Sequence, residues 1–234
     1  ITGQDRLGVL GPNGAGKSSL AKILVAQDSP DAGKCTKKSG LRSHYIAQNN
    51  YYSKHATIAD TLKNQTTSID QDSTFYKTLE QLSLSDLSIE INSLSGGGIK
   101  RVELATAFIS NYDLVVFDEP TNHLDLKTIV WLEENLKKAP FAWVCISHDR
   151  YFMTQICNKI LEINKIYPNG YKVFSGNYES FIRKKEEFIL DQISKIQSLK
   201  TKSKEENLWL ARGPKARSTK AKFRIEQAHQ LQSD

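Results

Sequence analysis

A glycine-rich segment near the start of the chain constrains the fold more than any other feature. Gly11–Ser18 reads GPNGAGKS; it follows the apolar segment Leu7–Leu10 and opens Ser18–Ala26, whose apolar residues have helical spacing. Glycines let several amide groups surround one anion, and the N-terminus of the following helix adds partial positive charge. The segment therefore predicts a phosphate-binding loop, with Lys17 at the β- and γ-phosphates of a nucleotide and Ser18 as a Mg²⁺ ligand.

Short apolar segments alternate with helical patterns along the rest of the first 176 residues. The predicted strands are Leu7–Leu10, His44–Ala47, Leu114–Phe117, Ala142–Ile146, Ile160–Ile163 and Tyr171–Phe174. The last two strands flank a turn at Pro168-Asn169-Gly170. Helices are predicted at Thr128–Lys138 and over most of 51–112. This alternation predicts an α/β fold with a mostly parallel sheet, of the phosphate-loop nucleoside triphosphatase class.

Two carboxylates and a histidine follow predicted buried strands. Asp118 and Glu119 come directly after Leu114–Phe117, and His148 follows Ala142–Ile146. Ligands of open α/β sheets bind at the carboxyl ends of the strands. Asp118 suits a Mg²⁺ shell, Glu119 suits a base for an attacking water, and His148 can contact a γ-phosphate. Strand-end acids are often only solvated caps, and a lone histidine is usually structural, so these residues indicate catalysis only together with the phosphate loop.

A second glycine-rich segment, Leu94–Gly98, reads LSGGG and precedes a predicted helix. Ser95, consecutive amide groups and a helix N-terminus make another receptor for an anion. A flexible linker is the alternative for such a segment taken alone.

The order of these motifs resembles that of ABC ATPases. The matching segments are Gly11–Ser18 for Walker A, Gln48 for the Q-loop, Leu94–Gly98 for the signature, Leu114–Glu119 for Walker B, Asn122–Asp125 for the D-loop and His148 for the switch histidine. The segments PTNHLD (120–125), SHDR (147–150) and GNY (176–178) resemble the ABC-F family, and WLARGPKAR (209–217) resembles the linker of its Uup branch.

This resemblance implies that the chain binds ATP and Mg²⁺, with each ATP held between the phosphate loop of one domain and the signature of another. The implied nucleotide-binding residues are Gly11, Asn13, Gly14, Ala15, Gly16, Lys17, Ser18 and Ser19. The implied catalytic residues are Glu119, His148 and Gln48, and the implied Mg²⁺ ligands are Ser18, Gln48 and Asp118. Ser95, Gly96 and Gly97 would contact the ATP of a second ABC ATPase half or of a homodimer mate.

Three departures from the family pattern stand out. Gly98 occupies a signature position that usually carries a larger side chain, so we expect looser packing at this corner of the signature. The stretch before Ile1, with the expected adenine-stacking aromatic, is absent, so the N-terminal part of the domain is expected to be missing. No second phosphate loop follows, so the second ATPase half is not in this chain.

Positive charge is concentrated at the C-terminal end. The net charge of the chain is +6, and the span from Arg183 to Arg224 holds 13 Lys or Arg against 5 Asp or Glu. Such an excess indicates a polyanionic partner. The predicted nucleic-acid contacts are Arg212, Lys215, Arg217, Lys220, Lys222 and Arg224, with Trp209 able to stack on an exposed base.

The composition changes at Gly176-Asn177, which predicts an ABC domain over 1–176, with its helical subdomain at about 51–112, and a basic linker over 177–234. Ile182, Ile189 and Ile196 recur every seven residues, with Leu199 three further on, as in a weak coiled-coil seam. A break at Gly213-Pro214 and a second helix over 215–232 predict a helical hairpin. A frayed, solvated tail is the alternative.

The function expected from these features is an ATP-hydrolysing ABC-F half that acts on the ribosome or another structured RNA through its linker. Alternatives are the ATP-binding subunit of an ABC transporter and a DNA-associated ATPase of the Uup type. The 46 residues between Gln48 and Ser95 are too few for the long coiled coil of chromosome-type ABC ATPases.

No apolar run reaches the length of a membrane span. Three cysteines without paired spacing, two of them in apolar surroundings, favour buried thiols in a reducing cytoplasm.

Overall fold

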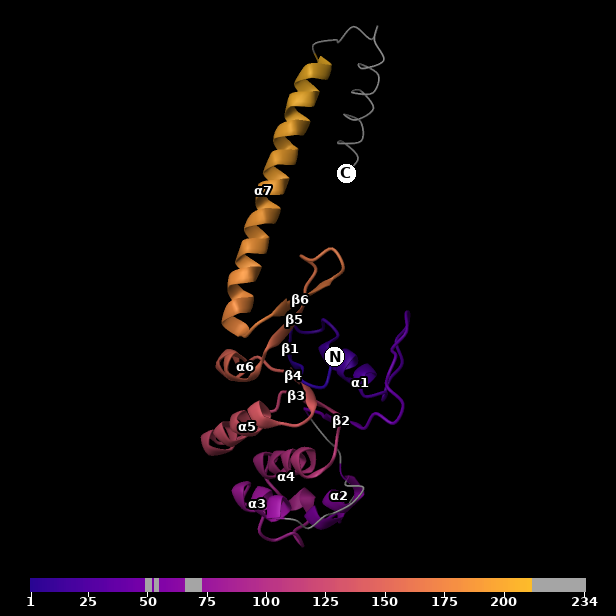
Figure 1. Ribbon diagram of the computed structural model, residues 1–234, viewed down its shortest axis with the longest axis vertical. Helices are drawn as coiled ribbons and strands as arrows, with labels where there is room; N and C mark the ends of the chain where they lie inside the picture. The colour runs from indigo at the N-terminus through magenta and orange to yellow at the C-terminus, as the bar shows by residue number, and fades with distance from the viewer. Residues whose placement is uncertain (49–51, 53–54, 66–72, 212–234) are drawn as a thin grey trace. The chain divides into compact units, whose positions relative to one another are not determined.

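The computed structural model describes residues 1–48, 52, 55–65 and 73–211 (Figure 1). The chain divides into two compact units, Ile1–Phe181 and Ile182–Asp234. The first unit contains a sheet flanked by helices, and the described part of the second unit is helical.

The sheet of the first unit has six strands in the order β2-β3-β4-β1-β5-β6. Their bounds are β1 Arg6–Leu10, β2 Ser43–Ile46, β3 Leu114–Asp118, β4 Ala142–Ile146, β5 Lys159–Ile163 and β6 Tyr171–Ser175. All neighbouring pairs are parallel except β5 and β6, which are antiparallel around the predicted turn. The α/β fold with a mostly parallel sheet is confirmed.

The helices are α1 Lys17–Leu24, α2 Ile58–Gln65, α3 Ser73–Gln81, α4 Gly96–Ile109, α5 Leu126–Lys138, α6 Arg150–Ile156 and α7 Tyr178–Ala211, with a 3₁₀ turn η1 at Ile91–Ser93. Side-chain caps explain where three of them begin. Ser95, Asp125 and Asp149 each accept a hydrogen bond from the amide three residues on, at 3.1, 2.8 and 3.0 Å, and so satisfy a donor that the helix leaves unpaired. Helix α1 follows the left-handed Gly16 instead, and ends at Leu24 because Ala26 has φ of 62°.

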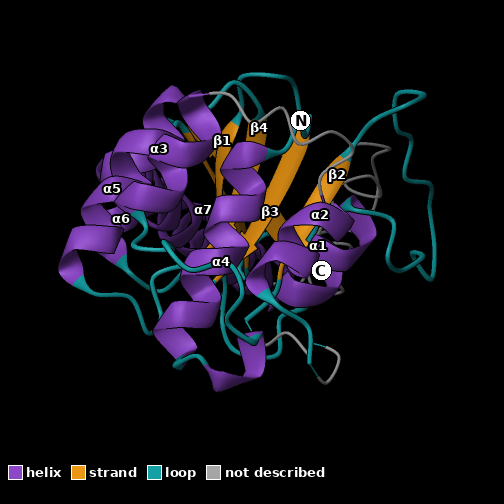
Figure 2. Cartoon of the chain, turned by 90° about the horizontal axis from the view of Figure 1, so that it is seen from below, coloured by secondary structure: helices purple, strands orange, loops and turns teal. Residues whose placement is uncertain are grey.

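Helices cover both faces of the sheet (Figure 2). Strand residues alternate between the faces, so Leu7 and Val9 pack with Ala21 of α1, whereas Gly8 faces α6. A Cβ at Gly8 would lie 2.4 Å from the end of the Met153 side chain, so a larger residue would require the side chains of this face to shift. Strands β3 and β4 are buried along their whole length, as their continuous apolar sequences predict.

The strand order brings the carboxyl ends of β3, β4 and β1 together. The chain leaves β1 for the far edge at β2, and later passes from β4 over to β5 on the other side of β1. In the register, Ile146 lies opposite both Val9 and Asp118. The segments that follow these three strands therefore meet at the point where the strand order reverses, which is where α/β sheets bind ligands.

The predicted linker falls only partly on described residues. Helix α7 runs from Tyr178 to Ala211, and Ile189, Ile196 and Leu199 of the predicted seam are 37%, 51% and 51% exposed. The turn at Gly213-Pro214, the second helix and the six basic residues predicted to bind nucleic acid lie outside the described residues.

Two further expectations concern the cysteines and the membrane. Cys145 and Cys157 are buried, as predicted, and Cys35 is exposed. Burial raises the pKa of the Cys157 thiol to about 12, so this thiol stays protonated near neutral pH. Within the described residues, no helix combines the length and the hydropathy that crossing a bilayer would require.

Candidate nucleotide-binding site

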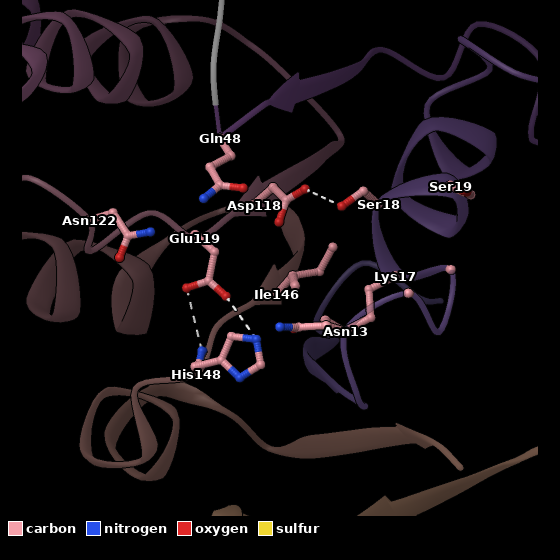
Figure 3. A pocket seen from close by; sticks show the side chains of 12 residues that line it. Asn13, Lys17, Ser18, Ser19, Gln48, Asp118, Glu119, Asn122, Ile146 and His148 are labelled. Atoms are coloured by element: carbon pink, nitrogen blue, oxygen red, sulfur yellow. Dashed lines mark hydrogen bonds and ion pairs between the residues drawn. The ribbon is translucent and has the colours of Figure 1, made fainter. Parts of the chain in front are cut away.

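A cavity of about 670 Å³ lies at the carboxyl edge of the sheet (Figure 3). Its lining contains most of the residues predicted to bind or cleave a nucleotide, namely Asn13, Gly14, Gly16, Lys17, Ser18, Ser19, Gln48, Asp118, Glu119 and His148. Asn122 and Ile146 complete the lining, whereas Gly11 and Ala15 of the predicted set are not part of it. Residues from the phosphate loop and from the ends of β2, β3 and β4 are thus brought into one cavity.

The phosphate loop has the backbone geometry that its glycines predict. Gly14 and Gly16 have φ of 78° and 87°, which side chains other than glycine rarely adopt. Gly11 has no room for a side chain, because a Cβ would lie 2.8 Å from the carbonyl oxygen of Ile163. Its carbonyl accepts a hydrogen bond from Lys17 Nζ at 2.9 Å, and that of Pro12 accepts a second at 3.1 Å. The ammonium group therefore lies against the start of the loop.

Asp118 is 4% exposed and accepts two hydrogen bonds on one oxygen. Ser18 Oγ and the hydroxyl of Tyr45 each donate to Asp118 Oδ2 at 2.8 Å. Burial, and then the neighbouring carboxylate, raise the pKa of Tyr45, so its hydroxyl keeps its proton and remains a donor. The aspartate is held in one orientation from both the phosphate loop and β2.

Glu119 turns out of the end of β3 toward the cavity. Its φ is 49°, in the left-handed region, and its amide donates to the carbonyl oxygen of Ile146 at 2.8 Å, which anchors the turn to β4. His148 faces it: the amide of His148 donates to Glu119 Oε2 at 3.4 Å, and His148 Nε2 lies 3.6 Å from Oε1 (Figure 3). Burial raises the pKa of Glu119, and the contacts with His148 oppose this effect. A carboxylate with a raised pKa is a better proton acceptor.

The signature residues contribute to a different surface. Ser95, Gly96 and Gly97 do not line the nucleotide cavity; Gly96 lines a second cavity of about 160 Å³ beside Gln48 and His123. A Cβ at Gly97 would lie 2.5 Å from the carbonyl oxygen of His123, so the signature packs closely on the loop after β3.

Gly98 lies in the first turn of α4, and the looser packing expected there stays a prediction. It is buried, its amide donates to Ser95 Oγ at 3.1 Å, and a Cβ there would lie 3.1 Å from Leu94 Cβ. The helix start is thus closed and capped with glycine at this position.

Some residues of the site were not among those predicted from the sequence. Tyr45 donates a hydrogen bond to Asp118, which lies 73 positions later in the chain. The sequence indicates this contact only weakly: side chains alternate along β2, so Tyr45 and its neighbour His44 face opposite sides of the sheet. His44 stacks on Tyr112 at 4.8 Å between ring centres, and burial lowers its pKa to about 4, so it is a neutral packing residue. Asn122 was noted only as part of a loop motif.

The donor set fits a magnesium ion. Among the described residues, no group of three or more His, Cys, Asp or Glu could hold a metal. Mg²⁺ in nucleotide sites takes one or two protein oxygens together with phosphates and waters. Ser18 Oγ and Asp118 Oδ2 lie 2.8 Å apart, close to the roughly 2.9 Å between neighbouring octahedral oxygens around Mg²⁺. Gln48 adds an amide oxygen at the same cavity.

Comparison with known proteins places these features in a family. Residues 1–122 match the family model described as ABC transporter. The chain is 33% identical to ATP-binding protein Uup of Buchnera aphidicola subsp. Acyrthosiphon pisum, over 100% of the chain and 40% of that protein. It is 28% identical to Energy-dependent translational throttle protein EttA of Mycobacterium tuberculosis, over 98% of the chain and 48% of that protein.

Among solved structures, the complex of archaeal ribosomal stalk protein aP1 and ribosome recycling factor aABCE1 aligns with a TM-score of 0.66 and 26% identity. That alignment covers 78% of the chain and 37% of the solved one. The chain thus spans less than half the length of the relatives it matches here.

Proposed function

The chain belongs to the ABC transporter family of ATP-binding domains, and we propose that it is one half of an ABC-F ATPase that hydrolyses Mg-ATP together with a second half. Relatives named Uup and EttA, which are ABC-F ATP-binding proteins, cover essentially the whole chain and support this assignment. The observation that carries the proposal is the convergence of Ser18, Asp118, Glu119 and His148 on one cavity from the ends of three neighbouring strands.

Each of these groups has a definite task toward ATP. The amide groups of the phosphate loop and the ammonium of Lys17 bind the β- and γ-phosphates. Ser18, Asp118 and Gln48 would hold Mg²⁺, which when bound neutralises charge on the β- and γ-oxygens. Glu119 accepts a proton from the water that attacks the γ-phosphorus, and the bond to the β-phosphate oxygen breaks to release ADP. In this proposal His148 donates to the γ-phosphate, which is supported by its position in the cavity lining beside Glu119 and by the 62% exposure of its side chain.

The signature residues support a two-domain sandwich. Ser95 caps α4, so its side chain and the first amides of the helix can receive an anion, yet none of Ser95, Gly96 and Gly97 lines the cavity at the phosphate loop. We infer that they serve an ATP bound by the partner half. A homodimer of this chain would satisfy the same geometry only through a head-to-tail arrangement in which each signature faces the other phosphate loop.

The variant Glu119→Gln tests the catalytic assignment. The amide keeps the shape of the carboxylate but cannot accept the proton, so turnover in a protein with both halves should fall by about 10²–10⁴-fold while ATP remains bound. Turnover is measured by phosphate release and binding by a fluorescent ATP analogue. Undiminished turnover would reject Glu119 as the base.

We further propose that the protein binds the ribosome and acts on it through the ATP-driven closure of its two halves. Two relatives support it: EttA is named a translational throttle protein, and aABCE1 is named a ribosome recycling factor. The excess of Lys and Arg between Arg183 and Arg224 would favour binding to RNA phosphates. In this proposal Tyr178–Ala211 is the first helix of the linker, and the protein works in the cytoplasm.

Co-sedimentation tests the ribosomal target separately from the chemistry. The full-length Glu119→Gln protein should pellet with ribosomes when ATP is present and much less without it, because ATP holds the two halves closed in this variant. If the variant binds ATP but stays in the supernatant under both conditions, the ATPase assignment stands and the ribosomal target fails.

A further inference from the structure

Helix α4 carries a buried pair of opposite charges whose place in the fold is not explained by stability. Lys100 and Glu103 are each 5% exposed, and Lys100 Nζ lies 3.1 Å from Glu103 Oε2. Removing two charges from water costs several kcal/mol per ion, and their attraction repays this only where further hydrogen bonds complete the site. Well-packed apolar residues of similar volume often stabilise a fold equally well or better.

The further hydrogen bonds of this pair go to both flanks of Gln48. Lys100 Nζ donates to the carbonyl oxygen of Ala47 at 2.9 Å, and Ala47 directly precedes Gln48. The hydroxyl of Tyr52, four residues after Gln48, donates to Glu103 Oε1 at 2.9 Å. Two residues of one turn of α4 thus bond Ala47, which adjoins Gln48, and Tyr52, which lies four positions after it.

Gln48 itself lies between the nucleotide cavity and α4. It lines the cavity of the phosphate loop together with Asp118, and it also lines the smaller cavity that Lys100 and Glu103 border. Figure 3 shows its amide beside the carboxylate of Asp118. A shift of the main chain at Ala47 would therefore move the amide relative to the oxygens of Asp118 and Ser18.

We propose that Lys100 and Glu103 are positioning residues for Gln48, which set its amide at the Mg²⁺ side of the nucleotide site. The ammonium of Lys100 holds the carbonyl of Ala47, and the carboxylate of Glu103 holds Lys100 in place and accepts a hydrogen bond from Tyr52. This inference rests on the proposed binding of Mg-ATP, and it assigns a role to a pair that does not line the nucleotide cavity.

A Mg²⁺ titration of nucleotide binding tests the proposal in the full-length protein. Replacing either residue alone would leave its partner charged and buried, so the test variant is Lys100→Met/Glu103→Leu, which removes both charges at similar volume. The control makes the same two kinds of change at an exposed ion pair on α7. It is Lys195→Met/Asp191→Leu, where Lys195 Nζ and Asp191 Oδ2 lie 2.6 Å apart.

The expected result separates positioning from folding. The test variant should keep wild-type affinity for a fluorescent ATP analogue in EDTA and should still unfold in one cooperative transition, since the loss of the bonds to Ala47 and Tyr52 offsets the relief of two buried charges. The Mg²⁺ concentration at which ATP binding is half-maximally strengthened should rise by about 2- to 150-fold, the range for neighbouring groups that act together. When Gln48 is already replaced by Ala, the Lys100→Met/Glu103→Leu substitutions should raise the Mg²⁺ midpoint little further, because the pair acts through Gln48. The control pair should leave the midpoint unchanged.

Three outcomes would overturn the proposal. An unchanged Mg²⁺ midpoint would do so, and so would an effect that is fully additive with Gln48→Ala. If the double variant does not fold, Tyr52→Phe decides: loss of its hydroxyl should raise the midpoint at least about twofold, and no rise refutes the role. A wild-type protein that fails to bind ATP would instead defeat the proposed function itself, so the two failures are distinguishable.

Discussion

The close contact between the signature and the loop after β3 predicts how alanine at two adjacent glycines changes the free energy of unfolding. Gly96 and Gly97 are the first two residues of α4, and alanine at either position has the better helix propensity. Their surroundings differ: a Cβ at Gly96 would lie 3.7 Å from the ring of His123, an ordinary contact, whereas a Cβ at Gly97 would lie 2.5 Å from the carbonyl oxygen of His123. Gly96→Ala is therefore a matched control for Gly97→Ala.

The magnitude follows from how far the oxygen must move. Contacts of this type below 3.0 Å essentially do not occur, so the carbonyl of His123 has to retreat by at least about 0.5 Å. His123 already has φ of 66°, which leaves its backbone little freedom to adjust. Forcing extra volume into a packed site costs about 1–3 kcal/mol, and the gain in helix propensity is about 0.5–1 kcal/mol at most. We expect Gly97→Ala to be less stable than Gly96→Ala by about 1–3 kcal/mol.

Urea unfolding of the nucleotide-free chain, followed by far-ultraviolet circular dichroism, measures this difference without any effect on ATP binding. For a unit of this size, about 1–3 kcal/mol corresponds to a melting temperature about 2–12 °C lower. Gly96→Ala should match the wild type or exceed it. If the two variants unfold with equal free energies, within about 0.3 kcal/mol, the close approach of Gly97 to His123 is not a feature of the folded protein.

Three other predictions concern binding. Lys17→Ala should weaken a fluorescent ATP analogue at least about tenfold, because phosphate charge is left under-compensated; wild-type affinity would refute the phosphate-loop assignment. Tyr45→Phe removes one donor to Asp118 and should raise the Mg²⁺ concentration needed for tight ATP binding about tenfold, with affinity in EDTA unchanged. Replacing Lys215, Arg217 and Lys220 together by Gln should weaken ribosome binding and lower its log–log salt slope by about 2–3. An unchanged salt slope would show that these residues do not contact RNA and that the linker acts only as a spacer.

The meeting of the candidate site residues in one cavity was largely predictable because its parts are encoded locally. Gly11–Ser18 carries its own backbone requirements, and Gly14 and Gly16 adopt the left-handed angles that the glycines permit. Asp118, Glu119 and His148 directly follow apolar strands, and parallel strands end at one edge, so their meeting required only the correct assignment of the strands. Sequence reasoning also identified the caps of α4 and α5 as parts of motifs, although not as caps.

Only the tertiary structure decided which neighbours these elements have. The strand order β2-β3-β4-β1-β5-β6 brings Tyr45 to Asp118 across 73 positions, and the packing of α4 beside β2 brings Lys100 to Ala47 across 53. The approach of Gly97 to His123 likewise depends on how two loops pack. Alternation and helical spacing show which face of an element is buried, but not what covers it. Contacts between distant segments arise from the joint packing of all the elements, and no local pattern encodes them.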